Sequence, residues 1–244
     1  MMKKYELTAN TKMVFGRKLF QIKALVSFGC VEAGELGGWI EKEENLSQSG
    51  NAWVYGNAWV SGNARVSGNA EVSGNAWVSG NARVSGNARV SGNVRVYGNA
   101  EVSGNAWVSG NVRVYGNAEV SGNARVSSNA EVSGNAEVSG NARVYGNARV
   151  SGNAEVYGNA RVYGNADHLV VGPIGSRSAY TTFYRRNDGV TMVVCGCFHD
   201  TIDIFEERVA QTHGDNAHAK AYRAAVQFVK AVINTDPAEE ISHE

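Results

Sequence analysis

The residues best suited to chemistry gather near the C-terminal end of the chain, in "CGCFH" at 195–199. Cys195 and Cys197 are two residues apart, so in a strand their thiols would share one face. With His199 or His213 as further ligands, two thiolates could hold a zinc ion in a tetrahedral site. Two small buried thiols in an ordinary strand also explain the pattern. We therefore expect no metal cofactor and keep these four residues as the alternative.

Two further residues could act on a bound molecule. His168 lies where the repeat described below ends, and a histidine there could serve as a general base. The segment "GPIGSR" at 172–177 could offer backbone N–H groups and the Arg177 guanidinium to an anion. An ordinary loop is the simpler interpretation of this segment.

The elements that must position these residues belong to a chain of 244 residues with 23 basic and 23 acidic side chains. A net charge of zero gives no general attraction to long nucleic acid or to an anionic membrane. No apolar run is long enough to cross a bilayer, and "MMKKYELTANTK" lacks the apolar centre of a signal peptide. Three cysteines are too few for a disulfide framework. We expect a cytoplasmic protein.

A repeat fills the middle of the chain. From Gly50 to Tyr163 the sequence consists of 19 hexads of the form Gly-Asn-Ala-x-Val-Ser/Tyr. Ala-x-Val alternates as a short strand does, with two side chains on one side and x on the other. Gly and Asn then supply a bend. The pattern predicts a solenoid. The hexads contain no His, Cys, Lys or Asp.

The length of one coil follows from a longer repetition. Residues 93–110 recur as residues 111–128 with two differences, which places the unusual Val94 and Val112 18 residues apart. One coil should therefore contain three hexads, and Val94 should stack on Val112.

The Val-x-x-x-Ala spacing resembles that of the hexapeptide-repeat proteins, whose fold is a left-handed parallel β-helix with triangular 18-residue coils. We therefore expect a mainly β chain with three parts. An N-terminal hairpin and lead-in cap occupies 1–49, the β-helix occupies 50–167, and an α/β cap of two strands and two helices occupies 168–244.

The flanks allow local predictions. We expect a hairpin over 12–25 that turns near Gly16, and Ile40 and Leu46 fall in the Ala phase of the repeat. Further on, two strands should flank the turn Asn187-Asp188-Gly189. Helices are predicted at 201–212 and at about 216–234.

The flanks also narrow the resemblance. "FQIKALVSFGCVEAGELGGWIEKEENLSQ" and the tail around "CGCF" and "THGDN" are similar to uncharacterised bacterial and phage or prophage hexapeptide-repeat proteins labelled putative transferases. Acyltransferases of that superfamily use a histidine on the coil wall as general base, beside an acyl-CoA donor. His168 is the residue placed to do this. The absence of histidine from the hexads departs from that pattern.

Sorting the outward residue x by its place in the coil gives three faces, listed here in chain order. The first face carries Trp53, Glu71, Arg89, Trp107, Arg125, Arg143 and Arg161. The second face carries Trp59, Trp77, Arg95, Arg113, Glu131, Arg149 and Asp167. The third face carries Arg65, Arg83, Glu101, Glu119, Glu137 and Glu155.

Stacked like charges are unfavourable within one chain. The carboxylates of Glu119, Glu137 and Glu155 each precede one of the guanidiniums of Arg125, Arg143 and Arg161 by one hexad, so both columns occupy the same coils. Placing the third face of one copy against the first face of the next closes a ring, most simply a homotrimer. Screening of single chains by solvent and salt is the alternative.

Aromatic residues mark a second candidate surface. Trp59 and Trp77 should stack, with Trp53 nearby, and they indicate either a partner contact or cover by the N-terminal hairpin. On the second face, Arg95 and Arg113 lie beside Tyr97 and Tyr115, a combination that could hold a planar anion; bare surface is the alternative.

The sequence therefore predicts a non-catalytic rigid scaffold or binding protein, possibly phage-encoded. Its faces or intersubunit clefts would meet a host or bacterial protein or a small anionic ligand. The alternative is a hexapeptide-repeat acyltransferase that uses an acyl-CoA donor.

Overall fold

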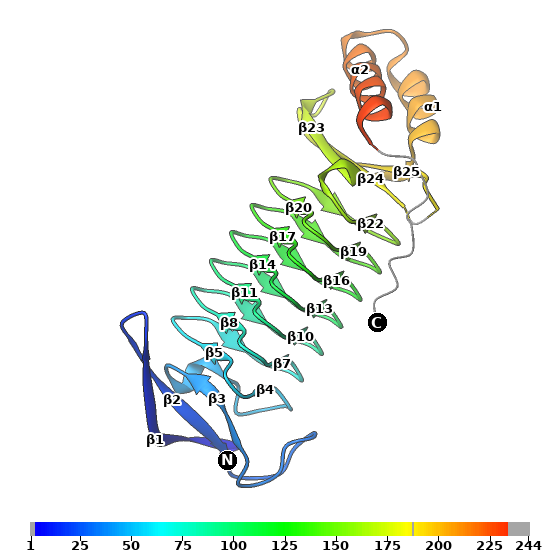
Figure 1. The fold of residues 1–244 in the computed structure, drawn as a ribbon. Coiled ribbons are helices and arrows are strands. Elements are labelled where there is room, and N and C mark those ends of the chain that lie inside the picture. Colours follow the sequence, from blue (N-terminus) through cyan, green and yellow to red (C-terminus); the bar gives the residue numbers. More distant parts are fainter. Residues whose placement is uncertain (1–2, 187, 234–244) are drawn as a thin grey trace.

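The computed structural model describes residues 3–186 and 188–233. Its body is a parallel β-solenoid of 19 two-residue strands, extended by strands at the N-terminal end and by an α/β unit at the C-terminal end (Figure 1). No helix in the described ranges has the length and apolar character needed to cross a bilayer.

Each face of the body is one parallel sheet. The first-face strands are β4 (Trp53–Val54), β7 (Glu71–Val72), β10 (Arg89–Val90), β13 (Trp107–Val108), β16 (Arg125–Val126), β19 (Arg143–Val144) and β22 (Arg161–Val162). The second-face strands are β5 (Trp59–Val60), β8 (Trp77–Val78), β11 (Arg95–Val96), β14 (Arg113–Val114), β17 (Glu131–Val132) and β20 (Arg149–Val150). The third-face strands are β6 (Arg65–Val66), β9 (Arg83–Val84), β12 (Glu101–Val102), β15 (Glu119–Val120), β18 (Glu137–Val138) and β21 (Glu155–Val156).

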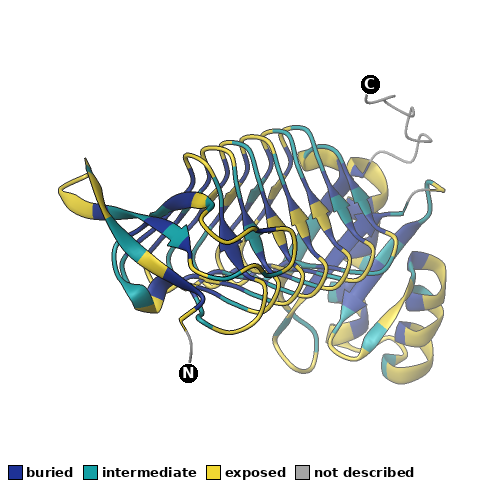
Figure 2. Cartoon of the chain, turned by 90° about the horizontal axis from the view of Figure 1, so that it is seen from below, coloured by how far each residue is buried: buried dark blue, intermediate teal, exposed yellow. Residues whose placement is uncertain are grey.

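The 18-residue coil is confirmed by the strand register. Arg95 pairs with Arg113, and the Arg95 N–H donates to the Val112 carbonyl at 2.9 Å, so Val94 lies next to Val112 in the coil above. The Ala and Val side chains of the hexads are 0–1% exposed and fill the interior, the dark blue of Figure 2.

Side-chain ladders reinforce the backbone ladders. In the described residues, 14 Asn-to-Asn hydrogen bonds of 2.9–3.3 Å link amides 18 residues apart along the three edges of the body. Within each ladder an Asn donates to the next coil and accepts from the previous one, whereas the first Asn only donates and the last only accepts along the ladder. Stacked amides of this kind add to the backbone pairing that holds parallel strands together.

The N-terminal hairpin is confirmed. Strands β1 (Tyr5–Val14) and β2 (Arg17–Ala24) pair around a turn at Phe15 and Gly16, both with positive φ. β2 then pairs with β3 (Leu36–Ile40), and β3 pairs with β5, so the hairpin extends the second-face sheet.

The phase predicted for the lead-in is wrong. Ile40 pairs with Val60 and Leu46 bridges Val66, so both occupy Val positions and not Ala positions. Each lies 20 residues before its partner, against the 18 that separate Val54 from Val72. Two extra residues between Leu46 and Val54 cause this shift.

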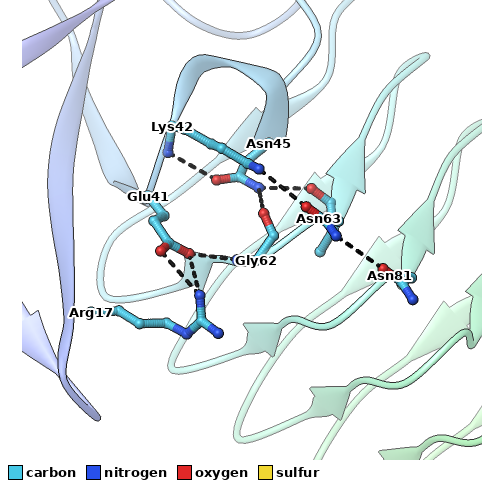
Figure 3. A network of polar contacts seen from close by, with 8 residues as sticks. Arg17, Glu41, Lys42, Asn45, Gly62, Asn63 and Asn81 are labelled. Carbon is cyan, nitrogen blue, oxygen red and sulfur yellow. Dashed lines mark hydrogen bonds and ion pairs between the residues drawn. The ribbon is translucent and has the colours of Figure 1, made fainter.

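Figure 3 shows the polar contacts that join the segment around the 3-10 helix η1 (Glu43–Asn45) to the first coil of the body. The fully buried Asn45 amide donates to the carbonyls of Gly62 and Ala64 at 3.1 and 2.9 Å and accepts from the Lys42 N–H at 2.9 Å. Lys42 Nζ donates to Asn63 at 3.2 Å and so begins one Asn ladder. The polar groups that an earlier coil would satisfy are therefore satisfied by side chains.

The body ends at η2 (Asn165–Asp167), and there the predicted place of Asp167 on the second face is wrong. Asp167 is buried, accepts from the N–H groups of Tyr163 and Gly164 at 2.7 and 2.9 Å, and forms an ion pair with Arg185 at 3.3 Å. With no further coil to supply acceptors, its carboxylate takes their place.

The C-terminal unit has four strands, not the two predicted: β23 (His168–Ile174), β24 (Ala179–Arg185), β25 (Thr191–Cys195) and β26 (Phe198–Thr201). The Pro and Gly residues of "GPIG" argued for a loop, but Gly172 and Pro173 lie within edge strand β23, and the turn begins only at Gly175. Tyr184 and Val194 pack on the body, whereas Phe183 and Val193 pack on the helices, so this sheet covers the last coil. Asn187, in the predicted turn, lies outside the described residues.

Both predicted helices are present as α1 (Ile202–His213) and α2 (Ala217–Val232). Thr201 caps α1 by accepting from the Ile204 N–H, and Gly214 follows its end. The apolar face predicted for α2, including Tyr222 and Val229, is buried.

Candidate interaction surfaces

An aromatic column runs along the second face from the hairpin tip. Trp59 and Trp77 stack at 4.7 Å, and Tyr97 and Tyr115 stack at 5.0 Å with their planes 2° apart. Trp77 joins the two pairs because its ring lies 6.3 Å from that of Tyr97. These separations are within the range of favourable ring contacts. The sequence predicted each pair but missed the junction, which joins rings from different positions of the hexad.

The N-terminal segment covers the start of this region. Trp53 is fully buried, with Tyr5 and Phe28 in edge contact at 6.1 and 5.4 Å. Phe15 of the hairpin tip lies 6.2 Å from Trp59 and 5.5 Å from Trp77. Of the two interpretations of the tryptophans, cover by the chain itself therefore describes Trp53, which is fully buried, and Trp59, which is 8% exposed.

Charged side chains lie beside Tyr97 and Tyr115, at the end of the aromatic column that is farther from the hairpin. Arg95 and Arg113 are exposed neighbours in the ladder. The Tyr115 hydroxyl donates to Glu131 at 2.5 Å, and this hydrogen bond raises the pKa of Tyr115. The structure thus brings together Arg95, Tyr97, Arg113 and Tyr115 as predicted, with Glu131 as an addition.

The first face carries a basic groove beside an Asn ladder. Trp107 is 45% exposed, and the Arg125 guanidinium lies 5.5 Å from its ring centre, a cation–π contact. Together with Arg89 and three ladder Asn residues they line a groove of about 410 Å³. Arg143 and Arg161 line a second hollow of about 130 Å³. Arg125, Arg143 and Arg161 are in register, as the sequence predicted, whereas the contact between Trp107 and Arg125 was missed.

The third face presents the matching acids. Glu101, Glu119, Glu137 and Glu155 pair in one ladder. The Tyr157 hydroxyl donates to Glu137 at 2.8 Å. Burial raises the pKa of Glu155, and the charge of Glu137 acts in the same direction. At Glu155, burial and the neighbouring charge of Glu137 thus both disfavour the ionised carboxylate.

The geometry assumed for a cysteine and histidine zinc site is wrong. Cys197 does not share a strand with Cys195 but lies in the two-residue turn between β25 and β26, where Gly196 has φ 61°. Gly followed by another residue is a signature of a type II′ hairpin turn, and this signal in "CGCF" was overlooked. His199 bonds the Tyr184 hydroxyl at 2.6 Å near Tyr157 of the body, away from the helices. In the described part of the chain, no three His, Cys, Asp or Glu side chains are grouped to hold a metal.

The remaining candidates of the tail do converge. Arg177, Cys195, Cys197 and His213 line one pocket of about 250 Å³ beneath the helices. The Thr181 hydroxyl donates to Cys195 Sγ at 3.3 Å, and Tyr222 Oη lies 3.7 Å from the same sulfur. Burial raises the pKa of Tyr222 to about 12, and the hydrogen bond with Cys195 adds to this.

His168 is 9% exposed at the start of β23, where it pairs with Tyr184. Burial lowers its pKa, and its Nδ1 has no hydrogen-bond partner within the described ranges. The ring is thus enclosed between the last coil and the C-terminal sheet. It does not stand on an open coil wall beside an acceptor.

Two protein families resemble parts of the chain. Residues 78–171 match the bactofilins, described as polymer-forming cytoskeletal proteins. Residues 58–74 and 64–80 match the YdcK β-solenoid repeat. No curated protein matches the sequence. The bactofilin match covers 94 of 244 residues (171 − 78 + 1), less than half of the chain, and so stands as a likeness of the solenoid body.

Proposed function

We propose that the protein is a rigid, non-catalytic scaffold whose solenoid body assembles side by side with two further copies of itself. One observation carries the proposal. A column of guanidiniums and a column of carboxylates occupy the same coils of the body on different faces. In a threefold ring, Glu119, Glu137 and Glu155 of each copy would face the corresponding arginines of the next.

The residues that would face each other in the earlier coils are also compatible with this ring. Arg65 would face Glu71, which is attractive. Arg83 would face Arg89, but Arg89 lies 3.6 Å from Glu71 of its own chain, which offsets part of its charge. Trp107 would face Glu101 and would be covered by the interface.

Covered ends favour assembly through the sides. At the N-terminal end, β3 pairs with the second face, Leu46 bridges the third face, and Lys4 Nζ donates to the Ala52 carbonyl of the first face at 2.9 Å. At the other end the C-terminal sheet covers the last coil. Open strand edges are the usual templates for end-to-end growth. The likeness to polymer-forming cytoskeletal proteins supports an assembling role.

Such an assembly would present its second face, with the aromatic column and Arg95 and Arg113, to a further protein or a planar anion. We place it in the cytoplasm of a bacterium or an infected host, following the resemblance of its flanks. The acyltransferase alternative depends on His168, and the enclosed ring offers it little support.

Charge reversal tests the ring. Reversing the acids (E119R/E137R/E155R) or the bases (R125E/R143E/R161E) should each give a single chain in sedimentation velocity, because both interface faces then carry one sign. Reversing all six residues together should restore the trimer. The matched control R95E/R113E/R149E reverses three exposed charges on the second face, which takes no part in the ring, and should stay assembled. If the six-residue variant remained a single chain while the wild type formed trimers, another surface would make the contact.

A further inference from the structure

The two C-terminal helices lie at the far end of the molecule from the N-terminal hairpin (Figure 1). Residues of both helices and of the neighbouring turns line a pocket there. Three elements meet there: the turn after β23 brings Arg177, the β25–β26 turn brings Cys197, and α1 brings Arg208 and His213. At about 250 Å³ it is somewhat smaller than the ~300–1,000 Å³ of drug-sized ligand pockets. It therefore suits a small molecule.

The rim of this pocket is positive. Arg177 and Arg208 both line it, and within residues 3–186 and 188–233 no Asp or Glu does. Other cations of the unit are paired with acids: Arg186 with Asp188, Arg223 with Asp215, and Lys230 with Glu206. Among the residues that the structure describes, neither Arg177 nor Arg208 forms an ion pair. Two guanidiniums at one cavity without a counter-charge leave a place for an anion.

The floor is apolar and closely packed. Phe198, Phe205 and Val209 line it, and Phe205 and Val209 are each only 4% exposed. A Cβ at Gly175 would come within 1.9 Å of Tyr222 Oη, so the turn that carries Arg177 rests directly on α2. This contact fixes the backbone of the turn two residues before Arg177.

We propose that the pocket binds a small organic anion, a carboxylate with a short apolar body. The carboxylate would accept hydrogen bonds from Arg177 and Arg208, and the apolar body would lie against Phe198, Phe205 and Val209. The site belongs to the C-terminal unit, so it does not depend on the side-by-side assembly.

Calorimetric titration of the full-length protein with octanoate tests the proposal. We expect saturable binding of one octanoate per chain, no measurable binding of octanol, and no measurable binding of inorganic phosphate. R177Q and R208Q should each weaken octanoate binding roughly tenfold or more, because each removes a charged hydrogen-bond donor. R83Q, which removes an exposed arginine from the third face, should bind like the wild type.

Both rim arginines are exposed, so the variants should fold, and unchanged helical circular dichroism would show it. Equal binding of octanol would overturn the role of charge, and phosphate binding as tight as octanoate binding would overturn the role of the apolar floor. Octanoate binding that survives in folded R177Q and R208Q would place the site elsewhere. Absence of octanoate binding would overturn the proposal.

Discussion

The solenoid body and the C-terminal unit are both built on β-sheets, but they arrange their outward side chains in different ways. In the body the coils repeat one geometry, so outward side chains form parallel columns that touch only where a long side chain reaches a neighbouring position of the hexad, as Trp77 does with Tyr97. In the C-terminal unit an antiparallel sheet and two helices bring residues from three elements to one cavity. A repeat therefore offers extended surfaces with a regular spacing, whereas an irregular unit offers convergence, which a small ligand requires.

The largest difference in stability between variants of the two regions should come from glycine substitutions. Gly104 has φ +67°, and a Cβ there would lie 2.9 Å from the Gly122 nitrogen in the next coil. Gly104→Ala should lower the free energy of unfolding in two ways. The left-handed backbone conformation costs a residue with a Cβ about 1–2 kcal/mol, and overpacking against the next coil adds about 1–3 kcal/mol. At Gly214 in the C-terminal unit (φ +56°) and at Gly152 in the body (φ +70°) a Cβ would meet nothing within 4 Å. Alanine at Gly152 should cost only the backbone contribution. At Gly214 the ψ of -117° lies outside the left-handed helical region, so the backbone contribution of alanine should be somewhat larger there.

Urea unfolding followed by tryptophan fluorescence measures this, because all five tryptophans lie between Trp39 and Trp107. Gly214→Ala needs helical circular dichroism as its readout. Equal losses for Gly104→Ala and Gly152→Ala would mean that contact with the next coil does not limit the glycine position.

Capping residues give the next contrast. Asn45→Ala removes three hydrogen bonds and leaves two body carbonyls without a partner, for a loss of about 2–3 kcal/mol. In the C-terminal unit, the exposed Asn216 caps α2 by accepting from His218 and Ala219 at 2.9 and 3.0 Å. Asn216→Ala should cost about 1 kcal/mol. Tryptophan fluorescence follows the unfolding of Asn45→Ala, and helical circular dichroism follows that of Asn216→Ala. A larger loss of unfolding free energy in Asn216→Ala than in Asn45→Ala would contradict the expected order.

The smallest effect is expected where the two regions meet. Burial raises the pKa of Glu155 above its ordinary value of 4.5, and its N–H donates to Thr182 of the C-terminal sheet. The folded chain therefore keeps this proton to a higher pH than the unfolded chain does. Stability should fall as pH rises from 4.5 through the folded pKa and should stay lower above it.

Glu155→Gln should remove this loss of stability. At pH 7 the variant should unfold at a slightly higher urea concentration than the wild type, and in more acidic solution the two should unfold at the same urea concentration. Glu101→Gln, nearer the N-terminus in the same column, is the matched control. The measurement is made at high salt, which should dissociate the proposed trimer, so that single chains are compared. A variant less stable than the wild type at pH 7 would show that the Glu155 carboxylate is stabilising.

The body could be predicted almost completely from the sequence because its rules are local. Gly and Asn fix each bend, and the distance between Val94 and Val112 gives the coil length. The prediction failed at Ile40 and Asp167, where the repeat begins and ends and the neighbouring coil is replaced by other groups. In the C-terminal unit, the residues of "CGCFH" were recognised but not their arrangement. A single turn at Gly196 and Cys197 separates them, and only the folded sheet shows that Arg208 joins Arg177.

Sedimentation velocity of the wild-type chain at low and high ionic strength is the most direct test of the scaffold. Paired charge columns predict a trimer at low salt that dissociates to single chains as salt screens the exposed pairs. A single chain at low salt would contradict the account.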